Sequence, residues 1–463
     1  MRERIEVVIL AAGLGTRMKS KRAKVLHRVA GRPLIDYVVD VAHAVSGSAP
    51  VVVVGHQRQA VQQHLGDRAR YAVQEPQLGT GHAVQQAAAV LGDLQGKSVL
   101  ILSGDVPLIR EATLRRLADE HRRAGNALTL LTMQPRDPAQ YGRIVRDGSG
   151  AVQKIVEAKD ASAEERQIGE VNAGIYLVEG PPLSQNLRKL SADNAQREYY
   201  LTDLIVLLRG AGQRVGAVAV DDPGEVAGVN SRAELAGVEE QIQRRVVDRL
   251  MSEGVTFRNP STVVIDSTVT IGSDTVVYPF VTLEGKTHIG ESCVIEPGVH
   301  LLDVSVGNDV HLKSGTVAED AIIDDEATIG PYAHLRPGTK LGRRVKVGNF
   351  VETKKAVLGE GSKASHLTYL GDADVGADVN IGAGTITCNY DGLHKHQTTI
   401  EDGAFIGSDT QLVAPVRVGK GAYVGAGSTI TKDVPADALA LTRIPQKNVE
   451  GWAVRRREKM KKT

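Results

Sequence analysis

Aromatic side chains are scarce in this sequence of 463 residues, since Phe, Tyr and Trp make up 3% of it and Trp occurs once. A core without rings must be filled by aliphatic side chains, each of which contributes about 1.5–3 kcal/mol when it is buried. Cysteine is scarcer still, because only Cys293 and Cys388 are present. Two thiols cannot form a disulfide framework, so we expect a protein of a reducing compartment, the cytoplasm.

Strong net charge and long apolar runs are also absent. The formal net charge is +1, which argues against a protein-wide nucleic-acid surface. The apolar run Val7–Ala12 is far shorter than the roughly 20 residues of a membrane helix. The segment that follows it, Gly13–Arg17, suits a binding loop better than a signal-peptide cleavage site. We therefore expect no nucleic-acid partner and no membrane insertion, and the chain length predicts at least two domains.

What the sequence does contain is a six-residue repeat of aliphatic residues between Val263 and Ile430. A helix repeats apolar residues every three or four positions and a strand every two, so neither period fits. Six fits a parallel β-helix, in which each short strand and its corner use one hexapeptide. The alternative is a β-sandwich with accidental spacing. The repeated residues are Ile265, Ile271, Val277, Leu283, Ile289, Ile295, Leu301, Val317, Ile323, Ile329, Leu335, Leu341, Val347, Ile406, Leu412, Val418, Val424 and Ile430.

The N-terminal part alternates strand-like and helix-like segments, which predicts a parallel sheet. A buried-strand pattern, Ile5–Leu10, leads into a glycine-containing loop with several basic residues, among them Arg17 and Lys24. Such a loop suits a polyanionic ligand, although its spacing matches neither the P-loop nor the dinucleotide fingerprint. Asp105 follows another buried strand, where ligands of open α/β sheets bind. It is either a Mg²⁺ ligand or a helix cap.

A capping box of Ser231 and Glu234 predicts the start of a helix, and Gly254 predicts its end. Taken as about 21 residues, this helix would be roughly 32 Å long. We therefore predict a first domain over residues 1–230, a linker helix over 231–252 and a β-helix domain over 253–463. The basic tail from Arg455 to Lys462 is expected to be solvated.

Between Val351 and Phe405 the hexapeptide pattern is interrupted by polar residues. Insertions in solenoid proteins map to one face, which is often the binding face. A lone histidine is usually structural, but His366 lies in this interruption close to lysines and Tyr369. We therefore treat the interruption as a candidate site.

Several motifs carry a resemblance to known families. The segments 10–18, 24–27, 79–82, 104–107, 141–144, 156–160, 171–174, 198–203 and 228–230 resemble the sugar-phosphate nucleotidylyltransferases. With the β-helix attached, the chain from about Ile5 to Trp452 resembles the bacterial bifunctional N-acetylglucosamine-1-phosphate uridylyltransferase/glucosamine-1-phosphate N-acetyltransferases. The resemblance implies an α/β Rossmann-like nucleotidyltransferase domain, a linker helix and a left-handed parallel β-helix of hexapeptide repeats.

The resemblance also implies the site residues. Lys24 and Arg17 would neutralise phosphates, and Asp105 and Asn230 would ligate Mg²⁺. The UDP-sugar would contact Leu10, Ala11, Ala12, Gly13, Lys24, Gln74, Gly79, Thr80, Ser103, Gly104, Asp105, Gly142, Glu157, Asn172 and Asn230. In the acetyltransferase, His366 would be the general base. The sugar phosphate would be held by Arg336, Lys354, Tyr369, Asn380, Asn389 and Tyr390. Acetyl-CoA would contact Ala383, Ser408, Ala426 and Arg443; Asn380 would also lie near its groove. Two positions depart from the family pattern, Ala23 in place of proline and Ser103 in place of an aromatic residue.

The implied function is synthesis of a cell-envelope precursor. Glucosamine-1-phosphate would be acetylated with acetyl-CoA, and the product would be coupled to UTP to give UDP-N-acetylglucosamine and pyrophosphate. The family implies homotrimers with acetyl-transfer sites between subunits. A second hypothesis is a monofunctional nucleotidylyltransferase whose β-helix only trimerises it or binds a regulator, and a third is an inactive scaffold. His366 with the Asn389–Tyr390 loop argues against the second hypothesis, and Asp105 with Asn230 argues against the third.

Overall fold

The computed structural model of the chain describes residues 4–138 and 140–461. The chain divides into two compact units, residues 1–243 and residues 244–463. Among the described residues, no helix is both long enough and apolar enough to span a lipid bilayer.

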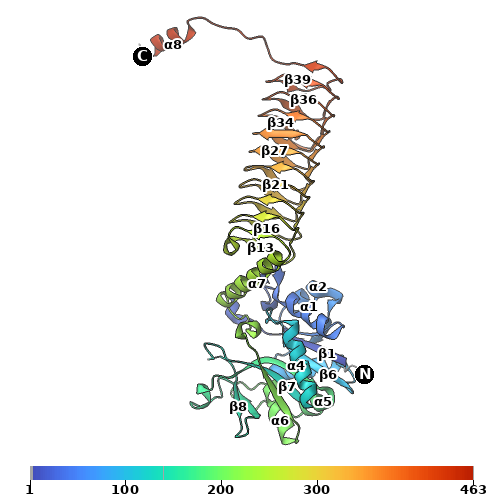
Figure 1. Cartoon of the computed structure of the whole chain (residues 1–463), viewed down its shortest axis with the longest axis vertical. Helices are drawn as coiled ribbons and strands as arrows, with labels where there is room; N and C mark the ends of the chain where they lie inside the picture. Colours follow the sequence, from blue (N-terminus) through green and yellow to red (C-terminus); the bar gives the residue numbers. More distant parts are fainter. Residues whose placement is uncertain (1–3, 139, 462–463) are drawn as a thin grey trace. The chain divides into compact units, whose positions relative to one another are not determined.

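A mixed β-sheet forms the centre of the first unit (Figure 1). Its strands lie in the order β11-β7-β10-β6-β1-β4-β5, and β8 and β9 extend it as a hairpin beside β10. The strands are β1 (Arg4–Leu10), β4 (Val51–Val54), β5 (Arg70–Val73), β6 (Lys97–Ser103), β7 (Leu128–Met133), β8 (Arg143–Arg146), β9 (Val152–Val156), β10 (Val171–Glu179) and β11 (Val215–Ala219). A small hairpin of β2 (Arg28–Val29) and β3 (Arg32–Pro33) lies apart from this sheet.

The prediction of a parallel sheet is wrong at β10. Strands β1, β4, β5 and β6 pair in parallel, but β10 runs antiparallel to both β6 and β7. The reason is that the β8–β9 hairpin precedes β10, where a helical crossover would have preserved the direction.

Helices cover both faces of the sheet. Helices α1 and α4 pack on the face that carries Val7 and Ile9, and helices α3, α5 and α6 pack on the face that carries Val8. Alternate residues of β1 are therefore buried on opposite sides, as a central strand requires. The helices are α1 (Leu34–Ser46), α2 (Arg58–Leu65), α3 (Thr80–Leu91), α4 (Glu111–Ala124), α5 (Gly180–Leu187) and α6 (Leu204–Gly210).

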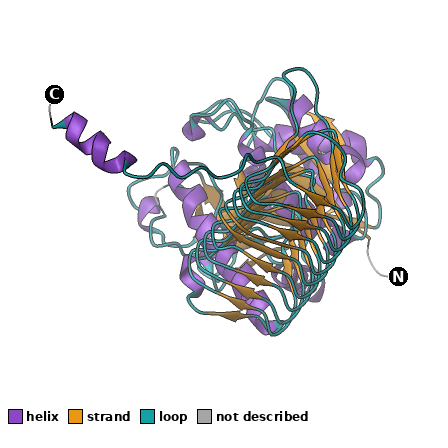
Figure 2. Ribbon diagram, turned by 90° about the horizontal axis from the view of Figure 1, so that it is seen from above, coloured by secondary structure: helices purple, strands orange, loops and turns teal. Residues whose placement is uncertain are grey.

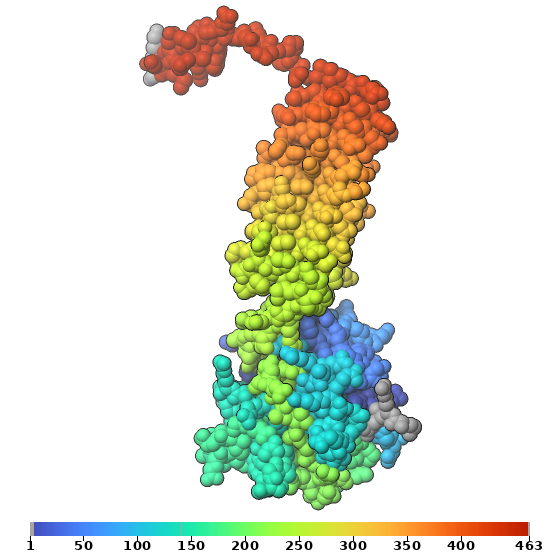
Figure 3. Space-filling model, in the orientation of Figure 1, coloured from blue at the N-terminus to red at the C-terminus, as the bar shows by residue number. Residues whose placement is uncertain are grey.

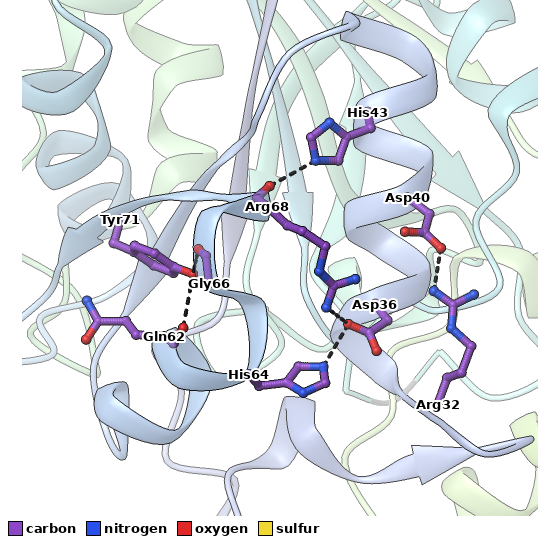
Figure 4. Close-up of polar contacts among 9 residues, drawn as sticks. All are labelled: Arg32, Asp36, Asp40, His43, Gln62, His64, Gly66, Arg68 and Tyr71. Carbon is purple, nitrogen blue, oxygen red and sulfur yellow. Dashed lines mark hydrogen bonds and ion pairs between the residues drawn. The ribbon is translucent and has the colours of Figure 1, made fainter. Parts of the chain in front are cut away.

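A polar cluster joins α1 to α2 and the turn after it (Figure 4). The buried carboxylate of Asp36 accepts a hydrogen bond from Arg68 at 2.7 Å and lies 2.8 Å from Nε2 of His64. The ring of His43 contacts the carbonyl oxygen of Arg68 at 2.9 Å. Because a buried carboxylate without partners is strongly destabilising, this cluster fixes α1 against its neighbours.

Helix α7 (Arg232–Ser252) begins at the predicted capping box. The N–H of Glu234 donates to Oγ of Ser231 at 3.2 Å, and the N–H of Ser231 donates back to the Glu234 carboxylate at 2.8 Å. The helix ends before Gly254, which has a φ of +99°. The predicted helix is therefore confirmed. The division between the two units falls within it, after Gln243, and the domain boundary at residue 230 stays a prediction.

The second unit is a parallel β-helix, which confirms the predicted fold class (Figure 2). Successive coils pair in parallel, in most cases at intervals of 17 or 18 residues, as in His300 with Val317 and His334 with Glu352. The coils form an unbroken column in the space-filling view (Figure 3). Its strands fall into three sheets, here called faces 1, 2 and 3.

Face 1 consists of β12 (Thr256–Phe257), β15 (Val276–Val277), β18 (Val294–Ile295), β21 (His311–Leu312), β24 (Thr328–Ile329), β27 (Lys346–Asn349), β30 (Lys363–His366), β33 (Asn380–Ile381), β36 (Phe405–Ile406), β39 (Tyr423–Val424) and β41 (Leu439–Ala440). Face 2 consists of β13 (Val264–Ile265), β16 (Thr282–Glu284), β19 (His300–Leu302), β22 (Val317–Glu319), β25 (His334–Leu335), β28 (Glu352–Lys354), β31 (Tyr369–Gly371), β34 (Ile386–Cys388), β37 (Gln411–Val413) and β40 (Thr429–Ile430). Face 3 consists of β14 (Thr270–Ile271), β17 (His288–Ile289), β20 (Ser305–Val306), β23 (Ile322–Ile323), β26 (Lys340–Leu341), β29 (Val357–Leu358), β32 (Ala373–Val375), β35 (Thr398–Ile400) and β38 (Val416–Val418).

The predicted aliphatic residues point into the column and are buried, with one exception. Val317 is only half-buried, and its neighbour Ala318 occupies the inward position opposite Leu301. Ala318 and the next inward residue, Ile323, are five residues apart rather than six, so counting six residues back from Ile323 leads to Val317 instead of Ala318. The prediction for Val317 is therefore wrong.

The predicted interruption between Val351 and Phe405 is also wrong as a break in the fold. The coils continue through it, but small or polar residues such as Thr353, Ala364 and Thr387 fill the inward positions. Only the segment between β34 and β35 leaves the column, because Ile386 pairs with Gln411, 25 residues later. After the last coil, an exposed helix α8 (Trp452–Met460) includes most of the predicted tail, and Lys462 lies outside the described residues.

Candidate functional sites

A cavity of about 370 Å³ opens at the carboxyl ends of β1 and β6, where open α/β sheets bind ligands. The structure brings ten of the predicted UDP-sugar residues to its walls. They are Leu10, Ala11, Ala12, Gly13, Lys24, Gln74, Gly79, Thr80, Ser103 and Asp105. The glycine loop and Asp105 come from segments far apart in the sequence and meet because β1 and β6 are neighbours.

The loop after β1 requires glycine at position 15. Gly15 has a φ of +61°, and a Cβ atom there would lie 2.8 Å from Cβ of Lys24. Residues other than glycine rarely adopt such a φ, and any side chain would push against the lysine. Gly15 therefore lets the loop pack closely against Lys24 at the edge of the cavity.

Lys24, Asp105 and Asn230 converge at one point. The ammonium of Lys24 forms an ion pair with Oδ2 of Asp105 and donates to Oδ1 of Asn230 at 3.1 Å. The hydroxyl of Ser103 donates to the other oxygen of Asp105 at 2.7 Å, so the serine at this departure from the family pattern orients the carboxylate. The N–H of Val229 donates to the carbonyl oxygen of Asp105 at 2.9 Å, which ties the Asn230 loop to the site.

This arrangement fits a divalent cation. Two oxygens, one from Asp105 and one from Asn230, already face a single positive charge, the Lys24 ammonium. Mg²⁺ prefers oxygen ligands and in such sites is commonly shared between carboxylates and substrate phosphates. Asp105 and Asn230 could therefore hold Mg²⁺ once Lys24 turns to a phosphate.

The predicted sugar-binding residues form a second group. The N–H of Asn172 donates to the carbonyl oxygen of Gly142 at 2.9 Å, and a Cβ at Gly142 would contact the carboxylate of Glu157 at 3.4 Å. Burial raises the pKa of Glu157, while the hydroxyl of Thr202 donates to its carboxylate at 3.3 Å and opposes that effect. Gly142, Glu157 and Asn172 are thus brought together.

Besides Asn230 and the sugar-binding group of Gly142, Glu157 and Asn172, two more predicted residues of the first unit, Arg17 and Gly104, are not among the cavity walls. Arg17 is exposed, and its guanidinium donates to Oε1 of Gln140 at 2.7 Å. Gly104 is buried behind the wall, and its N–H donates to the carbonyl oxygen of Leu10 at 2.9 Å. Arg17 must therefore leave Gln140 to reach a phosphate in the cavity, whereas Gly104 contributes through the backbone.

Sequence reasoning missed five residues that line the cavity, which are Leu14, Val25, Gln77, Ala83 and Glu198. Nε2 of Gln77 donates to the carbonyl oxygen of Ala12 at 2.5 Å, so it holds the glycine loop. Its position between Gln74 and Gly79, both of which were assigned, was the available signal. Glu198 belongs to a recognised motif but had been given no role.

In the second unit, the edge between faces 1 and 2 collects His366 and the predicted acetyl-CoA residues. The strand register pairs Ala364 with Ile381, Ile381 with Ile406 and Ile406 with Val424. Each of these paired residues is followed, two positions later, by a predicted residue. These are His366, Ala383, Ser408 and Ala426. They therefore occupy the same place on four successive coils. The guanidinium of Arg443 donates to the carbonyl oxygen of Ala426 at 3.0 Å and extends the series.

The predicted sugar-phosphate residues lie mainly on face 2. Arg336 and Lys354 occupy equivalent positions on neighbouring coils, because Leu335 pairs with Thr353. The guanidinium of Arg336 is held by Glu352 at 2.7 Å. Tyr369 follows on the next coil, and its hydroxyl lies over Gly371.

The remaining sugar-phosphate residues lie in three places. Asn389 is buried, and its amide donates to Asp372 at 2.5 Å beside Gly371, close to the Tyr369 hydroxyl. Tyr390 is exposed on the loop that leaves the column, with its hydroxyl bound to the carbonyl oxygen of Gly392. Asn380, by contrast, lies on face 1.

His366 is itself exposed at this edge. A cavity of about 340 Å³ on this unit is lined by Asp374, Gly376, Thr399, Ile400, Glu401, Asp402 and Lys420, and includes none of the predicted acetyl-transfer residues. His366 therefore borders an open edge of the column, and this cavity is not the predicted acetyl-transfer site.

A nucleotide-sized cavity on an α/β sheet, followed by a hexapeptide β-helix, defines a nucleotidyltransferase joined to a transferase of the hexapeptide class. Comparison with known proteins agrees. Residues 7–194 match the MobA-like NTP transferase domain, and residues 397–432 match the bacterial transferase hexapeptide family.

Full-length relatives identify the family. The chain is 51% identical over 453 residues to the bifunctional protein GlmU of Trichlorobacter lovleyi, covering 97% of this chain and 98% of that protein. It is 51% identical over 461 residues to that of Pelobacter propionicus, covering 99% and 100%, and 50% identical over 449 residues to that of Heliobacterium modesticaldum, covering 97% and 98%. The chain belongs to the bifunctional GlmU family. The predicted resemblance is confirmed, and so is the prediction of an enzyme with both acetyltransferase and uridylyltransferase activity.

Proposed function

We propose that the first unit joins N-acetylglucosamine-1-phosphate to UTP with the residues of its cavity. A phosphate oxygen of the sugar attacks the α-phosphorus of UTP in line with the departing pyrophosphate. Such a reaction needs positioning and charge neutralisation more than a protein nucleophile. The uridine side of UTP contacts the loop 10–13 together with Gln74, Gly79 and Thr80, and the sugar contacts Gly142, Glu157 and Asn172.

The charged groups of this site have separate tasks. Lys24 leaves Asp105 and binds phosphate oxygens, and Arg17 leaves Gln140 to do the same. Asp105 and Asn230 hold Mg²⁺, which when bound neutralises charge that builds up on the transferring phosphate oxygens. The proposal is supported by the way Asp105 and Asn230 already face one cation, the Lys24 ammonium.

We propose that the edge carrying His366 is the acetyl-transfer site. The imidazole removes a proton from the amine of glucosamine-1-phosphate as the amine attacks the thioester carbon of acetyl-CoA, and coenzyme A leaves as the thiol. Histidine suits this task because its ordinary pKa lies near neutral pH. Ala383, Ser408, Ala426 and Arg443 line the path of acetyl-CoA along the same edge.

The sugar phosphate is held by Arg336, Lys354 and Tyr369 on face 2, with Asn389 and Tyr390 beside them. Asn380 lies on face 1, across the edge from these residues. Residues on two faces of one convex column close around a small substrate only if a second copy of the chain brings its other face against the first. We therefore propose a homotrimer with its acetyl-transfer sites between subunits, and a reducing cytoplasm in which Cys293 and Cys388 remain free thiols.

The observation that carries the acetyl-transfer assignment is the register that aligns His366 with Ala383, Ser408 and Ala426. The test is an assay of the purified protein with acetyl-CoA and glucosamine-1-phosphate, with and without UTP. Without UTP we expect N-acetylglucosamine-1-phosphate and free thiol, and with UTP and Mg²⁺ we expect UDP-N-acetylglucosamine. EDTA should stop only the second reaction. Formation of no thiol in either mixture would contradict the acetyl-transfer assignment.

A further inference from the structure

Helix α7 contacts the uridylyl site at its first turn. One oxygen of Glu234 accepts hydrogen bonds from the N–H of Asn230 at 2.6 Å and from the N–H of Ser231 at 2.8 Å. These bonds are more than a helix cap, because Asn230 is the residue whose side-chain oxygen faces Lys24 beside Asp105. The first turn of α7 therefore fixes the backbone that presents this oxygen.

The same helix also contacts the segment that follows Lys24. The carboxylate of Glu239 accepts a hydrogen bond from the N–H of Ala30 at 2.9 Å, and Gln243 donates to its second oxygen at 2.9 Å. Ala30 has a φ of +43°, which is unfavourable for a residue with a side chain. A further contact joins Arg232 to Nδ1 of the buried His27 at 3.3 Å.

Together these contacts hold both sides of the cation site. His27 lies three residues after Lys24, directly beyond a short 3₁₀ helix (Lys24–Leu26) that carries the lysine into the cavity. Residues 232–243 of α7 thus reach the Lys24 segment through two contacts and the Asn230 segment through a third. A plain spacer between two domains needs none of them.

We propose that the first three turns of α7 are a working part of the uridylyl site, with Glu234 and Glu239 as positioning residues for Asn230 and Lys24. This inference rests on the uridylyl-transfer function proposed above and adds these two residues to it. Partners that orient a metal ligand typically change metal affinity or activity about 10–100-fold when they are removed. We expect an effect of that size from the loss of the Glu234 carboxylate.

The variants are made in the full-length chain. Glu234→Ala removes the acceptor for both N–H groups, whereas Glu234→Gln keeps an oxygen that can accept them. Glu239→Ala and Glu239→Gln form the corresponding pair for Ala30. Glu240→Ala is the matched control, because it removes the same charge from the same helix at an exposed position with no part in these contacts.

Three measurements separate positioning from simple helix stability. Binding of Mn²⁺ in the presence of UDP-N-acetylglucosamine is followed by electron paramagnetic resonance. Amide hydrogen exchange reports on the peptide that contains Asn230 and Ser231. Steady-state uridylyl transfer is measured as a function of Mg²⁺ concentration, and acetyl transfer in the same preparations shows whether the chain is folded and assembled.

For Glu234→Ala we expect Mn²⁺ binding about 10–100-fold weaker, a matching rise in the Mg²⁺ concentration needed for uridylyl transfer, and faster exchange at residues 230–231. Glu234→Gln should restore all three, and acetyl transfer should stay unchanged throughout. Glu239→Ala should lower the maximal rate of uridylyl transfer through Lys24, with Glu239→Gln close to the wild type.

Two results would overturn the proposal. One is a Glu234→Ala protein with a lower melting temperature but unchanged Mn²⁺ binding and Mg²⁺ dependence, since that would leave only a structural role. The other is an equal effect of Glu240→Ala. A wild-type protein without uridylyl transfer would instead contradict the proposed function itself, so the two failures are distinguishable.

Discussion

At the scale of single residues, Lys24 neutralises the carboxylate of Asp105 in the first site. Asp105 is 8% exposed, and a buried carboxylate left without a partner is destabilising by several kcal/mol. The ammonium of Lys24 removes that penalty. A lysine can later exchange this carboxylate for a phosphate oxygen, because its charge sits on a flexible four-carbon stem. Lys24 therefore stabilises the Asp105 carboxylate and remains able to bind a polyanion.

His366 is the residue whose replacement should separate the two reactions. We expect His366→Ala to lower the rate of acetyl transfer about 10²–10⁴-fold, since a general base contributes that much. Uridylyl transfer should remain at the wild-type rate, because its residues lie in the other unit. His288→Ala, an exposed histidine on a distant coil, serves as the control. A folded His366→Ala protein that keeps full acetyl transfer, or loses both reactions, would contradict the assignment.

Glu157 should make the rate of uridylyl transfer decline at a higher pH on the acidic side than an ordinary glutamate would. Burial raises its pKa, and the nearby carboxylates of Asp160, Asp203 and Glu198 act in the same direction. A carboxyl group with a raised pKa takes up its proton at a higher pH than an ordinary glutamate, whose pKa is about 4.3. The ionised acceptor for sugar hydroxyls is therefore lost earlier as the pH falls.

The measurement is kcat/KM for N-acetylglucosamine-1-phosphate as a function of pH. In the wild type we expect the acidic decline to begin above the range of an exposed glutamate. Glu157→Gln should have a lower kcat/KM and should lack this part of the decline. If the acid limbs of the two proteins coincide, Glu157 is not the group that titrates.

At the scale of elements, the sequence predicted well those helices and strands that a local pattern of residues specifies. The six-residue repeat predicts the coils, and the capping box predicts the start of α7, because both depend on neighbours along the chain. The direction of β10 depends on pairing with distant strands, and no local pattern encodes it. The coils between Val351 and Phe405 escaped detection because Thr and Ala occupy several inward positions there in place of Val, Ile or Leu.

The same distinction between local patterns and distant pairing applies to the candidate sites. Motifs located most cavity residues of the first unit, yet Gln77 was missed, because its position between Gln74 and Gly79 was the only signal and it belongs to no motif. The alignment of His366 with Ser408 and Ala426 depends on strand register, which accumulates over several coils and includes one coil lengthened by a loop. Sequence spacing alone could not provide it.

Replacing Gly348 tests whether the strand register between neighbouring coils positions His366. A Cβ at this position would overlap the backbone carbonyl of Ser365 on the next coil, directly before His366. Gly348→Ala should therefore destabilise the second unit by about 1–3 kcal/mol, as overpacking does, and displace the imidazole. We expect a lower kcat of acetyl transfer with unchanged uridylyl transfer, measured beside thermal unfolding.

Gly237→Ala on α7 is the contrasting variant, because a Cβ there has nothing within 4 Å. Alanine inside a helix is favoured over glycine by about 0.5–1 kcal/mol, so this change should leave both reactions intact and raise stability slightly. Wild-type acetyl transfer and stability in Gly348→Ala would show that the coils are looser at this edge than the structure indicates.

At the scale of the whole molecule, each unit has its own core and its own proposed chemistry. We expect a fragment of residues 1–243 to perform uridylyl transfer, because it keeps the cavity together with Glu234 and Glu239 of α7. A fragment of residues 1–230 should be at least about tenfold less active, since it lacks both carboxylates. The complementary fragment 244–463 should oligomerise and transfer acetyl groups, because its contacts run between neighbouring coils.

Size-exclusion chromatography, circular dichroism and both assays test these fragments. Equal activity of folded 1–230 and 1–243 would show that the helix is dispensable for the first reaction. A folded but inactive 1–243 would mean that the uridylyl site is not contained in the first unit.

The coiled column has one consequence for how such a protein can change over generations. The position of a residue within its coil determines the face on which it lies. The number of preceding coils determines only its height along the column. Duplicating or deleting one complete coil would lengthen or shorten the column and leave every other side chain on its original face. A coil that is one residue shorter keeps its inward row only by shifting which residue points inward, as Ala318 illustrates. The length of this unit can therefore evolve in whole-coil steps while the edge that bears His366 is inherited intact.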